Sequence, residues 1–125
     1  MAEINPRDQS LLLDMLLAVR DARSFVSGLS RDQFVSSRLH QSAVIRALEV
    51  IGEAAGKVSD ATASAHVEIP WRDITGMRHR LIHGYADVDL DRVWLTVRDH
   101  LPPLAVVLER LLPPDVEAPG KETNS

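Results

Sequence analysis

Apolar side chains recur every three or four residues along most of this chain, and that spacing constrains the fold more than any other feature. A first run ends near Gly28, and a second extends from Arg38 to about Lys57. A period of 3.6 residues is typical of helices that bury one face. In the first run we expect burial of Leu12, Met15, Leu16, Val19, Ala22 and Val26. In the second we expect a stripe of Leu39, Ala43, Ala47, Ile51 and Ala54, broadened by Val44, Leu48 and Ala55.

Shorter signals divide the next part of the chain. Pro6 or Asp8 can start the first helix. Ser30 and Gln33 have capping-box spacing and predict a short helix after it. Residues 59–65 are small and polar, which predicts a loop running up to Pro70. Pro70 then precedes a third predicted helix over 71–83, which the following glycine would end.

A fourth helix is expected after the acidic stretch 87–91, whose aspartates can cap free amides. Pro102 and Pro103 should kink or break it. No alternating strand pattern is present, so the sequence predicts an all-α protein. We expect one up-down bundle of four main helices over residues 1–112 and a disordered polar tail over 113–125. The fourth helix would bury Val93, Trp94, Val97, Leu101, Leu104, Leu108 and Leu111.

The composition limits the possible chemistry. None of the 125 residues is cysteine, which excludes disulfides, thiolate metal sites and cysteine nucleophiles. The first residues lack a signal-peptide pattern and no apolar run is long enough for a bilayer, so we expect a cytoplasmic protein without a membrane partner. The formal net charge is −4. Nucleic-acid binding would therefore depend on a local basic patch, or on one built by oligomerisation.

The segment GMRHRLIHGY, residues 76–85, gathers two arginines, two histidines and a tyrosine without an acid. It could be a solvated basic face, a metal site or a catalytic centre. Zinc fits poorly, because His79 and His83 share a helix face but Arg80 stands where a zinc protease has its glutamate. A calcium loop starting at residue 87 also fails, because its glycine and glutamate positions hold Arg92 and Arg98.

A merely solvated face would leave Leu81 and Ile82 pointing inward. The catalytic interpretation uses Arg78 to bind a phosphate and His83 to take or give a proton. These two residues lie about 140° apart around an ideal helix, so the long arginine would have to swing round. Cleaving RNA would also need a proton donor for the leaving 5′-oxygen. A second histidine could supply it, either His79 or His83 from a twofold-related subunit.

The pattern Arg78-x4-His83-x-Tyr85 resembles the R-x4-H-x-Y motif of HepT-type HEPN ribonuclease toxins. The blocks RALEVIGEAAGKVS, IPWRDITGMRHRLIHGY and DVDLDRVW resemble the same family, over about residues 8–112. The resemblance implies a helical homodimer whose two motifs face a shared cleft, and a metal-independent endoribonuclease. It also implies a partner, an MNT-type nucleotidyltransferase antitoxin that transfers AMP onto Tyr85. ATP and magnesium would belong to that partner, so we expect no cofactor in this chain.

The resemblance assigns roles residue by residue. Arg78 would hold the scissile phosphate, and His83 would be the general base or acid. His79 has a supporting polar role. Arg80 lies outside the motif and either steers the RNA backbone or is simply solvated. Tyr85 would accept AMP and line the substrate groove, and the added bulk and negative charge would block RNA there.

Several alternatives stay open at this point. Glu53 is either a partner of Arg78 or a buried acid that ties two helices together. The chain could instead be a non-catalytic HEPN module that binds a nucleotide or substrate beside a nucleotidyltransferase, or a structural dimer without a ligand. The sequence does not say which RNA is cleaved. A pair of basic strips, one from each subunit, would reconcile RNA binding with the acidic net charge.

Overall fold

The computed structural model describes residues 3–83 and 88–113, and every regular element within them is helical. This confirms the all-α prediction. The longer helices are α1 (Pro6–Phe25), α3 (Arg38–Lys57), α5 (Trp71–His83) and α7 (Leu101–Leu111). The shorter elements are α2 (Arg31–Val35), α4 (Asp60–Ala65), α6 (Leu90–Leu95) and the π-helical turn η1 (Thr96–His100).

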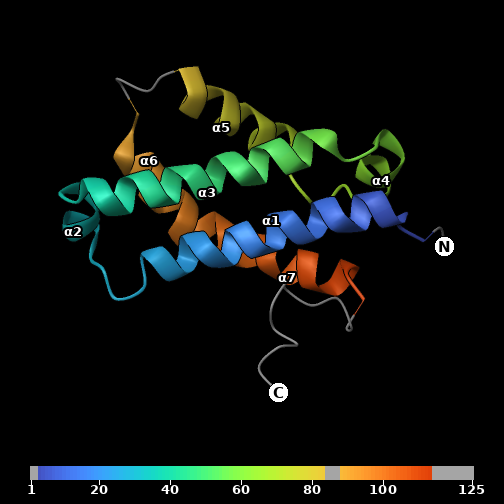
Figure 1. The fold of residues 1–125 in the computed structure, drawn as a ribbon, viewed down its shortest axis with the longest axis horizontal. Helices are drawn as coiled ribbons and strands as arrows, with labels where there is room; N and C mark the ends of the chain where they lie inside the picture. The colour runs from blue at the N-terminus through green and yellow to red at the C-terminus, as the bar shows by residue number, and fades with distance from the viewer. Residues whose placement is uncertain (1–2, 84–87, 114–125) are drawn as a thin grey trace.

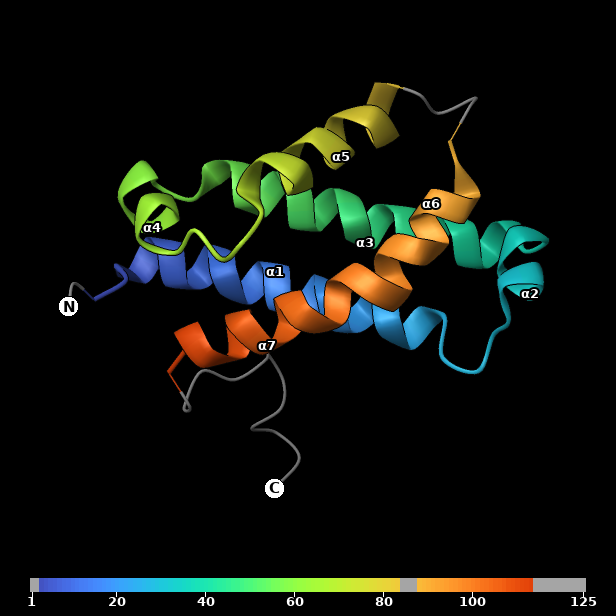
Figure 2. The same ribbon diagram turned by 180° about the vertical axis from the view of Figure 1, so that it is seen from behind.

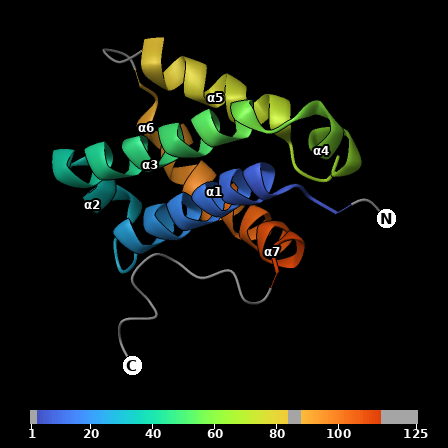
Figure 3. The ribbon, with the colours of Figure 1, turned by 45° about the vertical axis from the view of Figure 1, so that its right-hand side comes forward.

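The long helices form an up-down bundle, as predicted (Figure 1). α1 packs most extensively on α3, and it also contacts α7 and η1. α5 packs chiefly on α3. Figure 3 shows α5, α3, α1 and α7 following one another in that order. The helix that carries the basic segment is therefore an edge element of the bundle.

The core lies where α1, α3 and the α6–η1–α7 stretch meet, and the apolar faces predicted for the first and last helices are largely the buried ones. In α3 the prediction was wrong for Leu39, which is 76% exposed. A stripe of every fourth residue drifts about 40° per step around a helix, so its first member turns away from the core. The buried face of α3 consists of Val44, Ala47, Leu48, Ile51, Gly52, Ala54 and Ala55.

Polar caps set several helix ends. Ser30 and Gln33 form the predicted capping box of α2. Asp89 caps α6 by accepting a hydrogen bond from the Arg92 amide at 3.1 Å, which confirms the capping role predicted for the acidic stretch. The chain turns after α1 at Gly28, whose φ of 81° is in the left-handed region.

Residues 59–65 were expected to be a loop, but the structure has helix α4 there, capped by Ser59. α1 begins at Pro6, one of the two starts predicted from the sequence, and Asn5 caps it by accepting a hydrogen bond from the Asp8 amide at 2.8 Å. Asp8 is fully buried instead and accepts hydrogen bonds from Ser59 Oγ at 2.5 Å and Thr62 Oγ1 at 2.6 Å. The Ser59 amide and Asn5 Nδ2 donate to the same carboxylate at 3.2 and 3.0 Å. Asp8 thus joins α1 to the start of α4.

The predicted break at the two prolines takes the form of the π-helical turn η1. Proline has no amide hydrogen to continue the regular ladder. The chain widens just before it, and the Leu101 amide bonds to the Thr96 carbonyl, five residues back. α7 then begins with Pro102 in its first turn. None of the helices in the described ranges has the length and apolarity needed to cross a membrane.

Candidate active site

Helix α5 presents the basic segment, and its first turn is anchored. The indole Nε1 of Trp71 donates to the His66 carbonyl at 3.0 Å. Ile74 and Leu81 are buried, so the inward direction predicted for Leu81 is confirmed. Ile82, also expected to point inward, is 38% exposed. It lies one residue beyond Leu81 and so about 100° further around the helix, away from α3.

Arg78 lies on the side of α5 that faces α3, at Gly52. A methyl group added at Gly52 would come within 2.4 Å of Arg78 Cβ, so only glycine permits this approach. Gly52 belongs to a series of small residues in α3 that suits close helix packing. The Arg78 side chain is half-buried, and its Nε has no hydrogen-bond partner among the described residues. A buried donor without a partner is costly, so Arg78 is an unusual feature of the α3–α5 contact.

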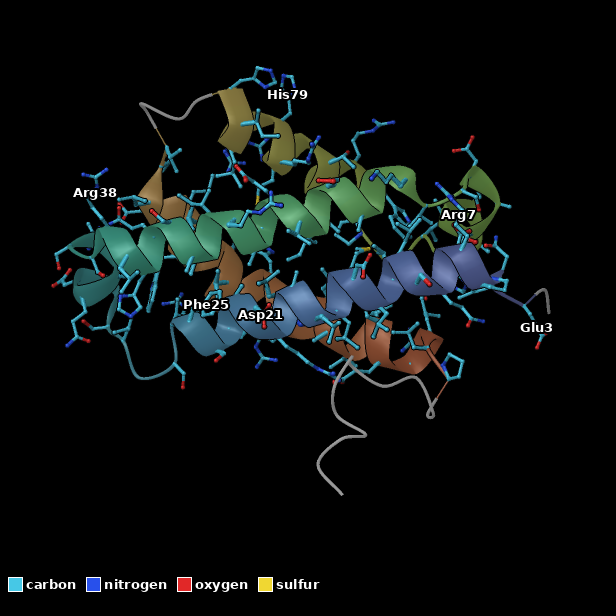
Figure 4. The ribbon with its side chains drawn as sticks, in the orientation of Figure 1. Glu3, Arg7, Asp21, Phe25, Arg38 and His79 are labelled. Carbon is cyan, nitrogen blue, oxygen red and sulfur yellow. The ribbon has the colours of Figure 1, made fainter. Side chains whose placement is uncertain are left out.

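His79 and His83 form a pair at the end of α5. They lie on one face, one turn apart, with ring centroids separated by 4.2 Å. His83 Nδ1 is 3.0 Å from the backbone carbonyl oxygen of His79. A carbonyl only accepts, so Nδ1 carries the hydrogen and Nε2 is left free. Both rings are exposed, and Figure 4 shows His79 projecting from α5 away from α3.

The structure brings the two histidines together but not the arginine with them. Arg78 packs towards α3, whereas His79 and His83 are exposed at the outer side of the helix. No hydrogen bond joins Arg78 to either histidine in the described part of the chain. The two kinds of group therefore offer their chemistry in different directions within one chain.

Three other residues named from the sequence complete this account. Arg80 is exposed and lines a groove beside α5. Tyr85 lies outside the described residues. Glu53 is partly exposed and pairs with Lys57 of its own helix at 3.7 Å, so neither of its expected roles is observed. An acid four residues before a lysine on a helix can satisfy itself locally.

The surroundings of α5 bear on two further points, metal binding and additional cationic side chains. Residues 3–83 and 88–113 contain no group of three or more histidine or acidic side chains arranged to share a metal ion. Sequence reasoning missed Arg92, which lines the same groove as Arg80 from the opposite side. Its place beside the core positions of α6 could have indicated an exposed cation. The approach of α6 to α5 is a tertiary contact, however, which sequence spacing alone does not reveal.

The fold and the motif together define the class. An up-down helical bundle with an R-x4-H-x-Y motif that begins near the end of its edge helix is the arrangement expected of a HEPN protein. The family model "Ribonuclease HepT-like" matches residues 15–111. The chain therefore belongs to the ribonuclease HepT-like family, which confirms the resemblance and agrees with the predicted ribonuclease class.

Similar proteins cover nearly the same length. One relative, "Probable ribonuclease HepT" of Thermococcus cleftensis, is 38% identical over 100 residues, or 80% of this chain and 91% of that protein. Another, "Putative RNase MJ1216" of Methanocaldococcus jannaschii, is 33% identical over 117 residues, 94% of each chain. No solved structure gives a significant match.

Proposed function

We propose that this chain is a metal-independent endoribonuclease toxin that cleaves RNA by acid–base chemistry at His83 and phosphate binding at Arg78. Membership of the ribonuclease HepT-like family supports the reaction class. The observation that carries the mechanism is the hydrogen bond between His83 Nδ1 and the His79 carbonyl. It fixes the imidazole so that one defined atom, Nε2, faces outward to exchange a proton.

His83 Nε2 takes the proton of a ribose 2′-hydroxyl. The 2′-oxygen then attacks the adjacent phosphorus, and the bond from phosphorus to the 5′-oxygen breaks. A second imidazolium, from His79 or from a histidine of the twofold-related subunit, gives its proton to the leaving 5′-oxygen. The products are a 2′,3′-cyclic phosphate and a 5′-hydroxyl. His79, whose ring centroid lies 4.2 Å from that of His83, has a supporting role beside it.

Arg78 stabilises the charge that builds up on the phosphoryl oxygens. Its planar guanidinium can bind a phosphate through two parallel hydrogen bonds, and its stem is held against Gly52 of α3. Since Arg78 and His83 are offered in different directions by one chain, a complete site needs a further element. A second copy of the chain supplies it, so that the basic strips of two subunits face one cleft.

The same site offers a means of control. We propose an MNT-type nucleotidyltransferase antitoxin as the partner, which transfers AMP from ATP onto the Tyr85 hydroxyl and releases pyrophosphate. The added phosphate carries negative charge two residues from His83. It would compete with RNA phosphate for the cationic groups of this segment.

The test is cleavage of single-stranded RNA by the purified, unmodified chain in the presence of EDTA. We expect cleavage to persist with the chelator, and to disappear in Arg78→Ala and in His83→Ala. An RNA with a 2′-deoxy sugar at the cleaved position should be resistant, because the nucleophile is missing.

Cleavage that requires a divalent ion, or that is unaffected by the 2′-deoxy sugar, would contradict this mechanism. A chain confirmed by mass to carry no AMP, and which binds RNA without cutting it, would favour a non-catalytic binding module instead.

A further inference from the structure

A groove runs between α5 and the α6–η1–α7 stretch, with α3 as its floor. Figure 2 shows these two walls from behind. The groove has a volume of about 670 Å³, which is within the range of small-ligand sites. Its lining is largely apolar and includes Ile51, Ile74, Met77, Leu95, Leu101 and Leu104. We refer to it below as the α5/α7 groove.

The polar residues of the α5/α7 groove are divided between its two walls. Arg80 comes from α5, while Arg92, Thr96 and His100 come from successive turns of the opposite wall. Arg80 and Arg92 also line an adjoining cavity of about 130 Å³ beside Leu81. Because the two walls run antiparallel, these arginines meet at the same end of the groove, towards the end of α5 that carries the histidines.

The two ends of the groove differ in charge. Arg80 and Arg92 are exposed, and within the described ranges neither forms an ion pair. At the other end lie the carboxylates of Asp73 and Glu68, and Glu68 is already paired with Arg110 at 3.3 Å. Asp89, which caps α6, also lines the cavity beside the two arginines. Two arginines against one aspartate leave this end positive, so an anionic ligand would be attracted to it rather than to the end with Asp73 and Glu68.

We propose that the α5/α7 groove binds a nucleotide of single-stranded RNA adjacent to the cleavage point. Its phosphate lies between Arg80 and Arg92, and its nucleoside lies against the apolar floor. This rests on the proposed ribonuclease function. Single-stranded RNA fits because its bases are free to leave the stack and enter an apolar groove. Arg80 and the histidines share α5, so a strand held here continues towards the motif.

The absence of native cysteine makes the groove directly testable. Leu95 lines the groove and is 43% exposed, whereas Val106 of α7 is 60% exposed and does not line it. We would introduce Leu95→Cys and Val106→Cys separately into a His83→Ala chain, which we expect to bind RNA without cutting it. A short single-stranded RNA should slow alkylation of the cysteine at 95 several-fold and leave that at 106 unchanged.

Arginine variants in the same background give a second measurement. Arg92→Ala should weaken RNA binding by about tenfold. It should also lower the slope of log affinity against log salt concentration by about the amount due to one phosphate contact. Arg72→Ala is the matched control, because Arg72 is an exposed arginine of α5 that does not line the groove. It should change affinity far less.

Equal effects of Arg92→Ala and Arg72→Ala, or no protection at position 95, would overturn the groove proposal. Protection that appears without RNA and grows with protein concentration would assign the groove to a second copy and also overturn it. Cleavage by the otherwise native chain tests the ribonuclease function separately. If the otherwise native chain cuts RNA but the cysteine at 95 is not protected, only the groove proposal is wrong. If the cysteine is protected but the otherwise native chain cuts no RNA, only the proposed cleavage is wrong.

Discussion

Arg78 combines a packing contact with the phosphate-binding role that we propose for it. Its Cβ sits against Gly52 of α3, while its Nε is buried with no partner in the described part of the chain. The aliphatic stem is thus held by packing against α3. The guanidinium is planar and carries five hydrogen-bond donors, whereas the ammonium group of lysine is a point charge.

We expect Arg78→Lys to lower the rate of RNA cleavage by about a hundredfold, because an ammonium group cannot replace the planar contact with a phosphate. The stem that packs on Gly52 is preserved, so the thermal midpoint of unfolding should change little. Arg80→Lys is the control and should keep most of the activity, since a point charge suffices to attract the backbone. Similar rates for both variants would show that Arg78 contributes only charge.

Between elements, the contact of α3 with α5 sets the position of the site. α5 packs chiefly on α3, and the closest approach is at Gly52. Gly56, one turn further along α3, has only an ordinary contact, because an added Cβ would lie 3.8 Å from Thr75 Cγ2. The two glycines therefore differ in what they tolerate, although they occupy the same helix.

Gly52→Ala should destabilise the chain by about 1–3 kcal/mol, because the new methyl group forces α5 away from α3. Gly56→Ala should instead stabilise it by about 0.5–1 kcal/mol, because alanine favours the helix and meets no obstacle. Urea unfolding followed by circular dichroism measures both. Equal changes in the two variants would mean that α5 does not pack on Gly52 as described.

The positions and ends of most helices could be predicted from the sequence, because helices depend on local apolar spacing and on capping residues. The bounds of α3 and α5 follow from periodicity and from Pro70, and the capping box of α2 follows from Ser30 and Gln33. Helix α4 was missed because its stability comes from Asp8, 51 residues before Ser59. The groove residue Arg92 was missed for the same reason: which helix lies opposite α5 is decided by packing.

On the scale of the whole molecule, Asp8 links the beginning of the chain to its middle. Burial alone would raise the pKa of Asp8, but hydrogen bonds from Ser59, Thr62 and Asn5 outweigh it and lower the pKa from 3.8 to about 2. The folded state therefore favours the charged carboxylate. This stabilisation is fully present above the unfolded pKa and is lost as the pH falls through the folded one.

We expect the free energy of unfolding to decrease by about 2 kcal/mol from this residue as the pH falls from about 4 to about 2. In Asp8→Asn the protein should be less stable at neutral pH, and its stability should change less over that acidic window. Chemical denaturation at a series of pH values gives both quantities. Parallel pH profiles for the two proteins would rule out Asp8 as the responsible group.

The edge position of α5 has an evolutionary consequence. Only one side of this helix is committed to the bundle, so the exposed positions of α5 other than His79 and His83, and the neighbouring wall of the groove, can accept substitutions without repacking the core. Members of the family could then differ in the RNA they bind while retaining the proposed cleavage groups. Variation among relatives should accordingly be concentrated on those exposed positions of α5 and α6, with the buried positions of α1 and α3 held nearly constant.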